Sequence, residues 1–267
     1  MPYELIELHF HGDYATITMN NPKRRNALSL AMMTELTDAF RRVGESSALG
    51  AILAANGPAF SAGHDFADMV GQDITAMRKL LRVCTTMMDT IQAIPQPVLA
   101  RVHALATAAG CQLVATCDLA VAATTAAFAT PGGKGGWFCT TPMVAVSRNI
   151  GRKRALEMLL TGEPIDAQTA ADWGLVNRVV PPEDLVSAAQ SLLEAATRGS
   201  FISKAIGKQA YYAQIDLPQV QAYNYAIEVM ASASQIPDAQ EGMRAFLEKR
   251  HPNFARPDPK SEKAAEA

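Results

Sequence analysis

The chain has 267 residues, 49% of them hydrophobic, and a formal net charge of −2. This length and composition can bury one large core or two modest ones, and the nearly balanced charge argues against nucleic acid as the main partner. The longest apolar stretch, residues 98–123, is interrupted by Arg101, His103, Gln112 and Asp118. We therefore interpret it as part of a core and expect no membrane-spanning segment.

The first half of the chain alternates between strand patterns and helix patterns. Residues 5–10 and 14–19 alternate in polarity around His11-Gly12-Asp13, which predicts a hairpin. Ser29 can cap the helix that follows. The further elements expected are a helix over about 30–43, a strand over 50–55, a short helical segment opening at residues 61–65, and a helix over about 74–93 that stops before Pro95 and Pro97.

The run from His103 to Asp118 lies between two apolar strand patterns, residues 97–102 and 118–123. Within it, the tiny residues from Thr107 to Gly110 form a turn that leads into a helix. The first N–H groups of a helix have no internal partner and lie at the positive end of its dipole, so a thioester enolate oxygen placed there would be stabilised. The same residues also fit a turn where a buried helix packs closely on a sheet, and both interpretations stay open.

Helical patterns dominate the second half of the chain. Residues 124–139 are expected to form a loop, and the residues after 252 are too polar to bury, so we expect a disordered tail over 253–267. Strands with intervening helices first, and helices only later, indicate an α/β core over 1–200 and a helical module over 201–252. Between the loop and the module we expect helices at about 141–149, 152–160, 167–173 and 183–197, and a strand at 176–180.

Cysteine spacing and the N-terminus indicate a compartment. Cys84, Cys111, Cys117 and Cys139 form no CxxC pair and follow no regular spacing, which suits reduced thiols inside a cell better than a disulfide framework. Residues 1–7 contain no basic segment followed by an apolar run, so no secretory signal is expected. A bacterial cytoplasm and a mitochondrial matrix after removal of a transit peptide both fit, and because no such peptide is visible we expect a cytoplasmic protein.

Three motif-like patterns predict no site. Gly132-Gly-Lys134-Gly-Gly136 lacks the residue order and the strand-to-helix context of a P-loop. His9 and His11 alternate on one strand face, but no third ligand is evident, so we expect no metal. No Gly-x-Ser-x-Gly elbow supports a serine hydrolase.

Five stretches that span nearly the whole chain share motifs with one known superfamily. They are Asn21-Pro-Lys-Arg-Arg-Asn26-Ala-Leu28, Phe60-Ser-Ala-Gly-His64-Asp65, the run 103–118, Leu159-Leu-Thr-Gly162-Glu-Pro-Ile-Asp-Ala, and Glu241-Gly242-Met-Arg-Ala-Phe246-Leu-Glu-Lys249-Arg250. In this order they resemble the motifs of the crotonase (enoyl-CoA hydratase/isomerase) superfamily, and residues 61–65, 106–115 and 128–132 further resemble one subgroup of it.

The resemblance implies an α/β crotonase-like spiral of ββα units with a C-terminal all-helical trimerisation module. It implies an acyl-CoA thioester as ligand, with coenzyme A as part of the substrate and no separate cofactor, and a homotrimer or a dimer of trimers. The main-chain N–H groups of His64 and Ala109 match the two oxyanion donors of the superfamily. The residues that the resemblance implies in substrate binding are Arg24, Arg25, Ala27, Ala62, His64, Asp65, Phe66, Ala109, Gly110, Pro131, Phe246 and Lys249.

The chain departs from the hydratase pattern at two positions. Hydratases of the superfamily hold a water molecule between two glutamates that act as base and acid. At the first position this chain has Gln112, and after Pro131 it has Gly132. Neither residue can transfer a proton, and each such group is typically worth ~10²–10⁴-fold in rate. We therefore expect hydration by that route to be crippled, while thioester binding is retained.

Four side chains are candidates for the missing acid or base, namely Asp68, His64, Lys134 and Cys139. Each also fits a structural role, as a helix carboxylate, a local hydrogen-bond partner, a solvated charge or a packed small side chain. Gln112 can still orient a water molecule or the acyl chain, because its amide both donates and accepts. Two hypotheses stay open: an isomerase, hydrolase or lyase that acts through a thioester enolate, and a non-catalytic acyl-CoA-binding or regulatory protein.

Overall fold

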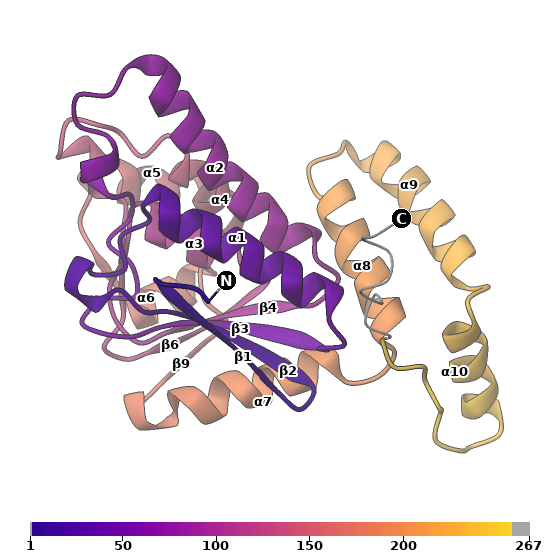
Figure 1. Cartoon of the computed structure of the whole chain (residues 1–267). Coiled ribbons are helices and arrows are strands. Elements are labelled where there is room, and N and C mark those ends of the chain that lie inside the picture. Colours follow the sequence, from indigo (N-terminus) through magenta and orange to yellow (C-terminus); the bar gives the residue numbers. More distant parts are fainter. Residues whose placement is uncertain (1, 258–267) are drawn as a thin grey trace, which may run out of the picture.

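The computed structural model describes residues 2–257, and its centre is a six-stranded sheet (Figure 1). The strands, in their order across the sheet, are β1 (Ile6–His11), β2 (Tyr14–Met19), β3 (Gly50–Ala55), β4 (Val98–Val102), β6 (Leu119–Ala123) and β9 (Arg178–Val180). β1 and β2 form the predicted antiparallel hairpin, with His11 opposite Tyr14 and Gly12 at φ +56°. The other neighbours are parallel, because crossover helices connect them.

A second sheet has three short strands that the sequence did not reveal. They are β5 (Ala106–Thr107), β7 (Ala127–Ala129) and β8 (Ile165–Asp166), in that order across the sheet. β7 corrects the prediction that residues 124–139 form a loop throughout. Strands of two or three residues are too short to show a period-2 pattern, and β7 exists because β5 and β8 pair with its two edges.

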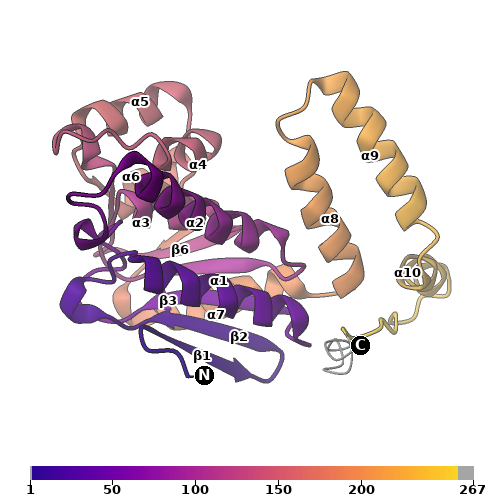
Figure 2. The ribbon, with the colours of Figure 1, turned by 45° about the horizontal axis from the view of Figure 1, so that its top comes forward.

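Helices cover both faces of the large sheet. They are α1 (Leu30–Glu45), α2 (Ile74–Ala93), α3 (Ala109–Thr116), α4 (Pro142–Asn149), α5 (Arg152–Thr161), α6 (Ala167–Trp173) and α7 (Leu185–Thr197), together with the 3₁₀ helices η1 (Pro22–Arg24), η2 (Phe66–Asp68), η3 (Pro131–Gly133) and η4 (Pro182–Asp184). α1, α2 and α3 lie on one face and α7 on the other (Figures 1 and 2). Successive side chains of a strand point to opposite faces, so in β3 Leu53 belongs to the larger core while Ile52 packs in a second core with Leu193 of α7.

Three C-terminal helices extend away from this core, in the segment where a helical module is expected. They are α8 (Phe201–Gln214), α9 (Gln219–Ala233) and α10 (Pro237–Leu247) (Figure 2). Neither α8 nor α9 contains a buried residue, and large apolar side chains such as Val220, Met230 and Phe246 are 73%, 77% and 82% exposed. Among the described residues, no helix is long and apolar enough to cross a membrane.

The last described residues lie against α10. The N–H groups of Asn253 and Ala255 donate to Glu241 at 2.9 Å and to Asp238 at 3.2 Å. Residues 253–257, which the sequence assigned to a disordered tail, are thus held by hydrogen bonds at the end of the described chain. The rest of that predicted tail lies outside the described residues.

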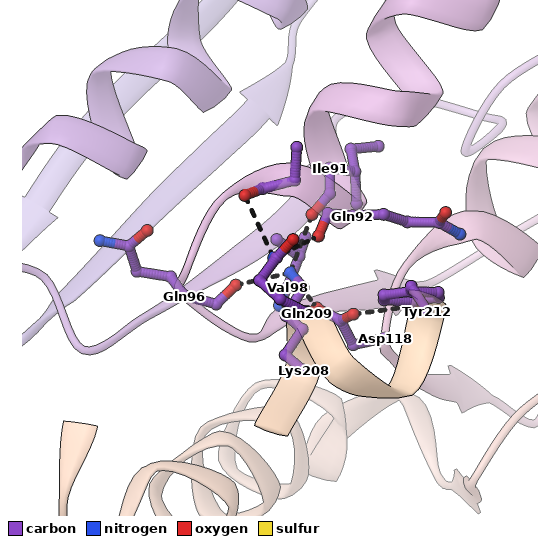
Figure 3. A network of polar contacts seen from close by, with 9 residues as sticks. Ile91, Gln92, Gln96, Val98, Asp118, Lys208, Gln209 and Tyr212 are labelled. Carbon is purple, nitrogen blue, oxygen red and sulfur yellow. Dashed lines mark hydrogen bonds and ion pairs between the residues drawn. The ribbon is translucent and has the colours of Figure 1, made fainter. Parts of the chain in front are cut away.

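A buried polar network joins α8 to the sheet core (Figure 3). The Lys208 ammonium donates to the carbonyls of Ile91 and Gln96 and lies beside Asp118 Oδ2, each at 2.8 Å. Tyr212 Oη donates to the other Asp118 oxygen at 2.7 Å. Burial lowers the pKa of Lys208, and the Asp118 carboxylate opposes that effect. All three donors of the ammonium therefore have acceptors, and the network fixes where α8 leaves the core.

Candidate functional site

A cavity of about 440 Å³ opens where three segments of the chain meet. One wall follows β3, the second is the turn between β5 and α3, and the third is the loop after β7. The lining residues are Ala62, His64, Phe66, Thr107, Ala108, Ala109, Pro131, Gly132, Lys134, Gly135, Trp137, Phe138, Cys139, Thr140, Thr141 and Pro142.

Two glycines allow the first two walls to approach each other. A Cβ atom on Gly63, whose φ is +82°, would lie 2.9 Å from the Thr107 oxygen and 3.1 Å from the Ala109 nitrogen. A Cβ atom on Gly110 would lie 2.5 Å from the Ser61 carbonyl oxygen. Gly110 therefore does not line the cavity. It allows the start of α3 to pack on Ser61, as the tight-packing interpretation of this turn expects, and the binding interpretation stays a prediction.

The turn before α3 has an unusual backbone conformation. Ala108 adopts φ 51° and ψ −118°, and sparsely populated conformations of this kind cost a non-glycine residue on the order of 1–3 kcal/mol. The Ala108 N–H donates to Ala129 of β7 at 2.8 Å, and the Thr107 N–H donates to Ser61 at 3.0 Å. These bonds hold the turn in place, and they leave the N–H of Ala109 as the first one of α3.

Two residues that line the cavity have main-chain N–H groups without an acceptor in the described part of the chain. The N–H groups of His64 and Ala109 have no acceptor among the described residues, although both residues line the cavity. On either side of the His64 N–H, the Gly63 carbonyl accepts from Leu28 at 2.7 Å and the Asp65 N–H donates to Leu28 at 3.4 Å. Main-chain N–H groups in a folded protein are normally paired, so these two differ from most of the backbone.

The imidazole of His64, a residue that lines the cavity, has no hydrogen-bond partner within residues 2–257. Both ring nitrogens are buried, and neither has a hydrogen-bond partner among the described residues. Burial lowers the pKa of His64 below its ordinary value of 6.5, and the nearby Leu28 carbonyl, which forms no hydrogen bond with the ring, and the Asp68 carboxylate oppose this shift. The Trp137 ring lies nearby, with the two ring centroids 6.3 Å apart. The imidazole is therefore neutral near pH 7.

The two positions that hold glutamates in hydratases contain no acid in this chain. Gln112 is buried, its Oε1 has no partner among the described residues, and its side chain does not line the cavity. Gly132 does line the cavity, but a Cβ atom there would lie 2.2 Å from the Trp137 carbonyl oxygen and 2.8 Å from Cys139 Sγ. Residues 137–139 thus occupy the space that a glutamate at position 132 would need.

Three of the four candidates for the missing acid or base have partners of their own. The Asp68 carboxylate accepts from the first N–H of α1 at 2.7 Å and thereby caps that helix. Lys134 forms an ion pair with Glu163. The Cys139 thiol accepts from the Gly132 N–H at 3.3 Å, and burial raises its pKa. Within residues 2–257, no three His, Cys, Asp or Glu side chains are grouped so that they could hold a metal ion.

The basic loop near the N-terminus lies against the segment that carries His64. Arg24 donates to both carboxylate oxygens of Asp65, at 2.6 and 2.7 Å, and the Ala62 N–H donates to the Arg25 carbonyl at 3.0 Å. Two of the segments expected to bind coenzyme A are therefore side by side at the mouth of the cavity.

The predicted substrate-binding residues fall into three groups. Ala62, His64, Phe66, Ala109 and Pro131 line the cavity. Asp65 and Gly110 belong to the wall segments without lining the cavity, and Arg24, Arg25 and Ala27 belong to the basic loop that packs against one of those segments. Phe246 and Lys249 lie at α10, on the other side of the molecule from the cavity-forming loops (Figure 1).

The sequence did not reveal the aromatic wall formed by Trp137 and Phe138. They follow Gly135 and Gly136 in an irregular loop, where no periodicity indicates which side chains face a pocket. Nor did it reveal the role of Asn26, whose buried amide accepts one hydrogen bond at 2.9 Å and donates two at 2.8 and 2.9 Å to hold the basic loop. Asn26 has φ 50°, and asparagine tolerates this left-handed conformation and bonds to nearby main chain. An asparagine inside the loop is therefore the sequence signal for its structural role.

The sheets, the short-stranded turns and the projecting helices together form a crotonase fold, which confirms the fold class expected from the sequence. The solved structure of human enoyl-CoA hydratase domain-containing protein 3 matches with a TM-score of 0.90 and 39% identity, over 94% of this chain and 100% of that one. An enoyl-CoA hydratase of Mycobacterium smegmatis also matches with a TM-score of 0.90, at 45% identity over 94% of this chain and 98% of that one.

The chain belongs to the enoyl-CoA hydratase/isomerase family, whose model matches residues 10–257. Rat enoyl-CoA hydratase domain-containing protein 3, mitochondrial, is 44% identical over 238 residues, which cover 88% of this chain and 79% of that protein. The superfamily and the subgroup expected from the five motifs are therefore confirmed.

The expected cytoplasmic location is wrong by comparison with these relatives. The rat, mouse and human proteins of this subgroup are all named mitochondrial. The cysteines are free and buried, but reduced thiols and the lack of a secretory signal are equally compatible with the interior of a mitochondrion. Neither feature could distinguish the two compartments.

Proposed function

We propose that this protein is an enzyme that binds an acyl-CoA thioester in the cavity and stabilises its enolate with the N–H groups of His64 and Ala109. The proposal depends on one observation, that both N–H groups lie at one cavity without an acceptor among the described residues. Donors that are already in place when charge develops on a carbonyl oxygen lower the barrier, by about 2.7–4 kcal/mol for one donor in a measured case. The family match supports a thioester as the ligand.

The coenzyme A arm would leave the cavity past Phe66, which is 69% exposed at its mouth, toward the loop that carries Arg24 and Arg25. The Arg25 guanidinium forms no ion pair among the described residues, and Arg24 is held by Asp65, so both cations are positioned near the path of the phosphates. Coenzyme A is thus part of the substrate, and no further cofactor is proposed.

The reaction differs from two-glutamate hydration. Gln112 does not line the cavity, and the space beside Gly132 is filled by residues 137–139, so no pair of acids can hold a water molecule there. An isomerase, hydrolase or lyase that passes through the enolate needs the oxyanion donors and a proton-transfer group, but not that pair.

Proton NMR in deuterium oxide, with crotonyl-CoA and butyryl-CoA, tests the proposal. We expect both thioesters to bind, deuterium to enter the α-carbon, and crotonyl-CoA not to be hydrated rapidly. Ala62→Phe fills the cavity and should abolish binding and exchange, whereas Ala67→Phe, on exposed η2, should leave both unchanged. A wild-type protein that binds neither thioester would refute the assignment.

A non-catalytic acyl-CoA-binding protein is the second candidate. The observation that favours it is the absence of an acid at positions 112 and 132, together with the lack of space for one at 132. In the same experiment, such a protein would broaden the resonances of both thioesters and incorporate no deuterium.

We further propose a homotrimer, or a dimer of trimers, assembled through α8, α9 and α10. The apolar residues exposed on these helices support an interface, because monomers rarely expose apolar patches larger than a few hundred Å². The position of Phe246 and Lys249 gives a second argument, since they can reach a coenzyme A arm only at the cavity of a neighbouring subunit.

A further inference from the structure

We propose that the His64 imidazole is the group that removes the α-proton of the bound thioester and returns it. This assignment rests on the acyl-CoA function proposed above and identifies the residue that replaces the family's glutamates in proton transfer.

The hydrogen-bonding state of the ionisable groups at the cavity distinguishes His64 from the other candidates. Asp68 caps α1, Lys134 is paired with Glu163, and the Cys139 thiol accepts from the main chain and has a raised pKa. By contrast, His64 lines the cavity, and both of its imidazole nitrogens are buried with no partner among the described residues. A buried polar group left in this state costs about 1–3 kcal/mol, so the site is more stable when a ligand atom meets the ring.

The position of the imidazole suits the α-carbon. His64 also supplies one oxyanion N–H, and its side chain branches from the Cα atom that is bonded to that nitrogen. A thioester oxygen bound to that N–H would lie at about 3 Å. The α-carbon is bonded to the same carbonyl carbon, so it falls within the reach of a side chain that lines the same cavity.

The proton transfer needs no partner beyond the thioester. The neutral imidazole nitrogen takes the proton from the α-carbon, the C–H electron pair forms the carbon–carbon double bond of the enolate, and the carbonyl electron pair moves to the oxygen held by the two N–H groups. The charge of the Asp68 carboxylate favours the imidazolium. Return of a proton to the α-carbon restores the thioester, and in deuterium oxide the imidazolium first exchanges its N–H with solvent.

The test uses variants that keep the main-chain N–H of residue 64. His64→Asn retains a hydrogen-bonding side chain but has no base. We expect calorimetry to show nearly unchanged affinity for butyryl-CoA. The rate at which deuterium enters the α-carbon should fall about 10²–10⁴-fold. His64→Ala should lose exchange to the same degree and recover part of it when free imidazole is added, because the truncated side chain leaves room for it at the cavity. His9→Asn, at an exposed position of β1, is the matched control and should exchange like wild type.

The other outcomes would overturn either the role of His64 or the acyl-CoA function. Wild-type exchange rates in His64→Asn, or no rescue of His64→Ala by imidazole, would show that another group moves the proton. Wild-type protein that binds butyryl-CoA without exchanging it would also refute the assignment and leave the non-catalytic binder. Failure of the wild-type protein to bind thioesters would instead refute the acyl-CoA function itself.

Discussion

A single glycine, Gly132, determines what the second glutamate position can hold. Because a Cβ atom there would lie 2.2 Å from the Trp137 oxygen, Gly132→Glu should displace residues 137–139 and destabilise the protein by about 1–3 kcal/mol, as overpacking does. We expect a lower melting temperature and no gain in crotonyl-CoA hydration. Gly151→Glu is the control, since no atom lies within 4 Å of a Cβ there and φ is −61°. A stable, hydrating Gly132→Glu protein would show that the loop gives way.

His64 also links stability to pH. Because burial lowers its pKa below 6.5, the unfolded chain binds the proton more tightly than the folded one. The stability associated with a neutral His64 is therefore fully present above 6.5 and is lost as the pH falls through the folded-state pKa. Urea unfolding should show wild type losing more stability than His64→Asn between about pH 7 and about pH 5. If wild type and His64→Asn lost the same free energy of unfolding over this pH range, the imidazole would not be held neutral.

Which residues form the cavity was predictable only where a stretch resembles a motif of the superfamily. Ala62, His64 and Ala109 could be placed because residues 61–65 and 106–115 carry such a resemblance. The state of Lys134 was not predictable, because its partner Glu163 lies 29 residues away and only the fold brings the two together.

Among the elements, the predictions succeeded where caps and proline define the ends. α2 covers residues 74–93 as predicted, because Asp73 accepts from Ala76 at 2.8 Å at its start and Pro95 follows its end. β7 has no such local signal. Its three residues become a strand only through pairing with β5 and β8, which are distant in sequence, so tertiary contacts decide its structure.

The Lys208 network acts at the level of elements, since Asp118 follows α3 directly and Lys208 belongs to α8. Lys208→Met leaves the Asp118 carboxylate without its cation and the two carbonyls without a donor. Breaking a buried pair in this way typically costs about 3–5 kcal/mol, which denaturant unfolding would measure. Lys204→Met, one turn earlier on α8 and in no ion pair among the described residues, should cost far less. A loss below about 1 kcal/mol for Lys208→Met would mean that solvent screens the network.

At the scale of the whole molecule, the chain divides into a part that buries its own apolar residues and a part that does not. The two cores on either side of the large sheet are closed by α1, α2, α3 and α7. The alternation of strands and helices in this core follows from patterns along the sequence. The packing partner of the C-terminal helices cannot be predicted from the sequence. An amphipathic helix has the same pattern whether its apolar face meets its own core or another subunit.

An assembly through α8–α10 makes a prediction that joins this surface to the cavity. Val220→Asp with Met230→Asp places two charges on an apolar face of α9, and burying an unpaired charge at an interface is strongly unfavourable. Light scattering after size exclusion should then show a monomer where wild type is a trimer or a hexamer. In the proposed assembly Phe246 and Lys249 reach a cavity only across a subunit boundary, so the monomer should also bind acyl-CoA more weakly. Val186→Asp, on the exposed side of α7, should change neither mass nor affinity. An unchanged mass for the α9 variant would place the interface elsewhere, whereas a monomer that binds with full affinity would separate the C-terminal residues from the coenzyme A site.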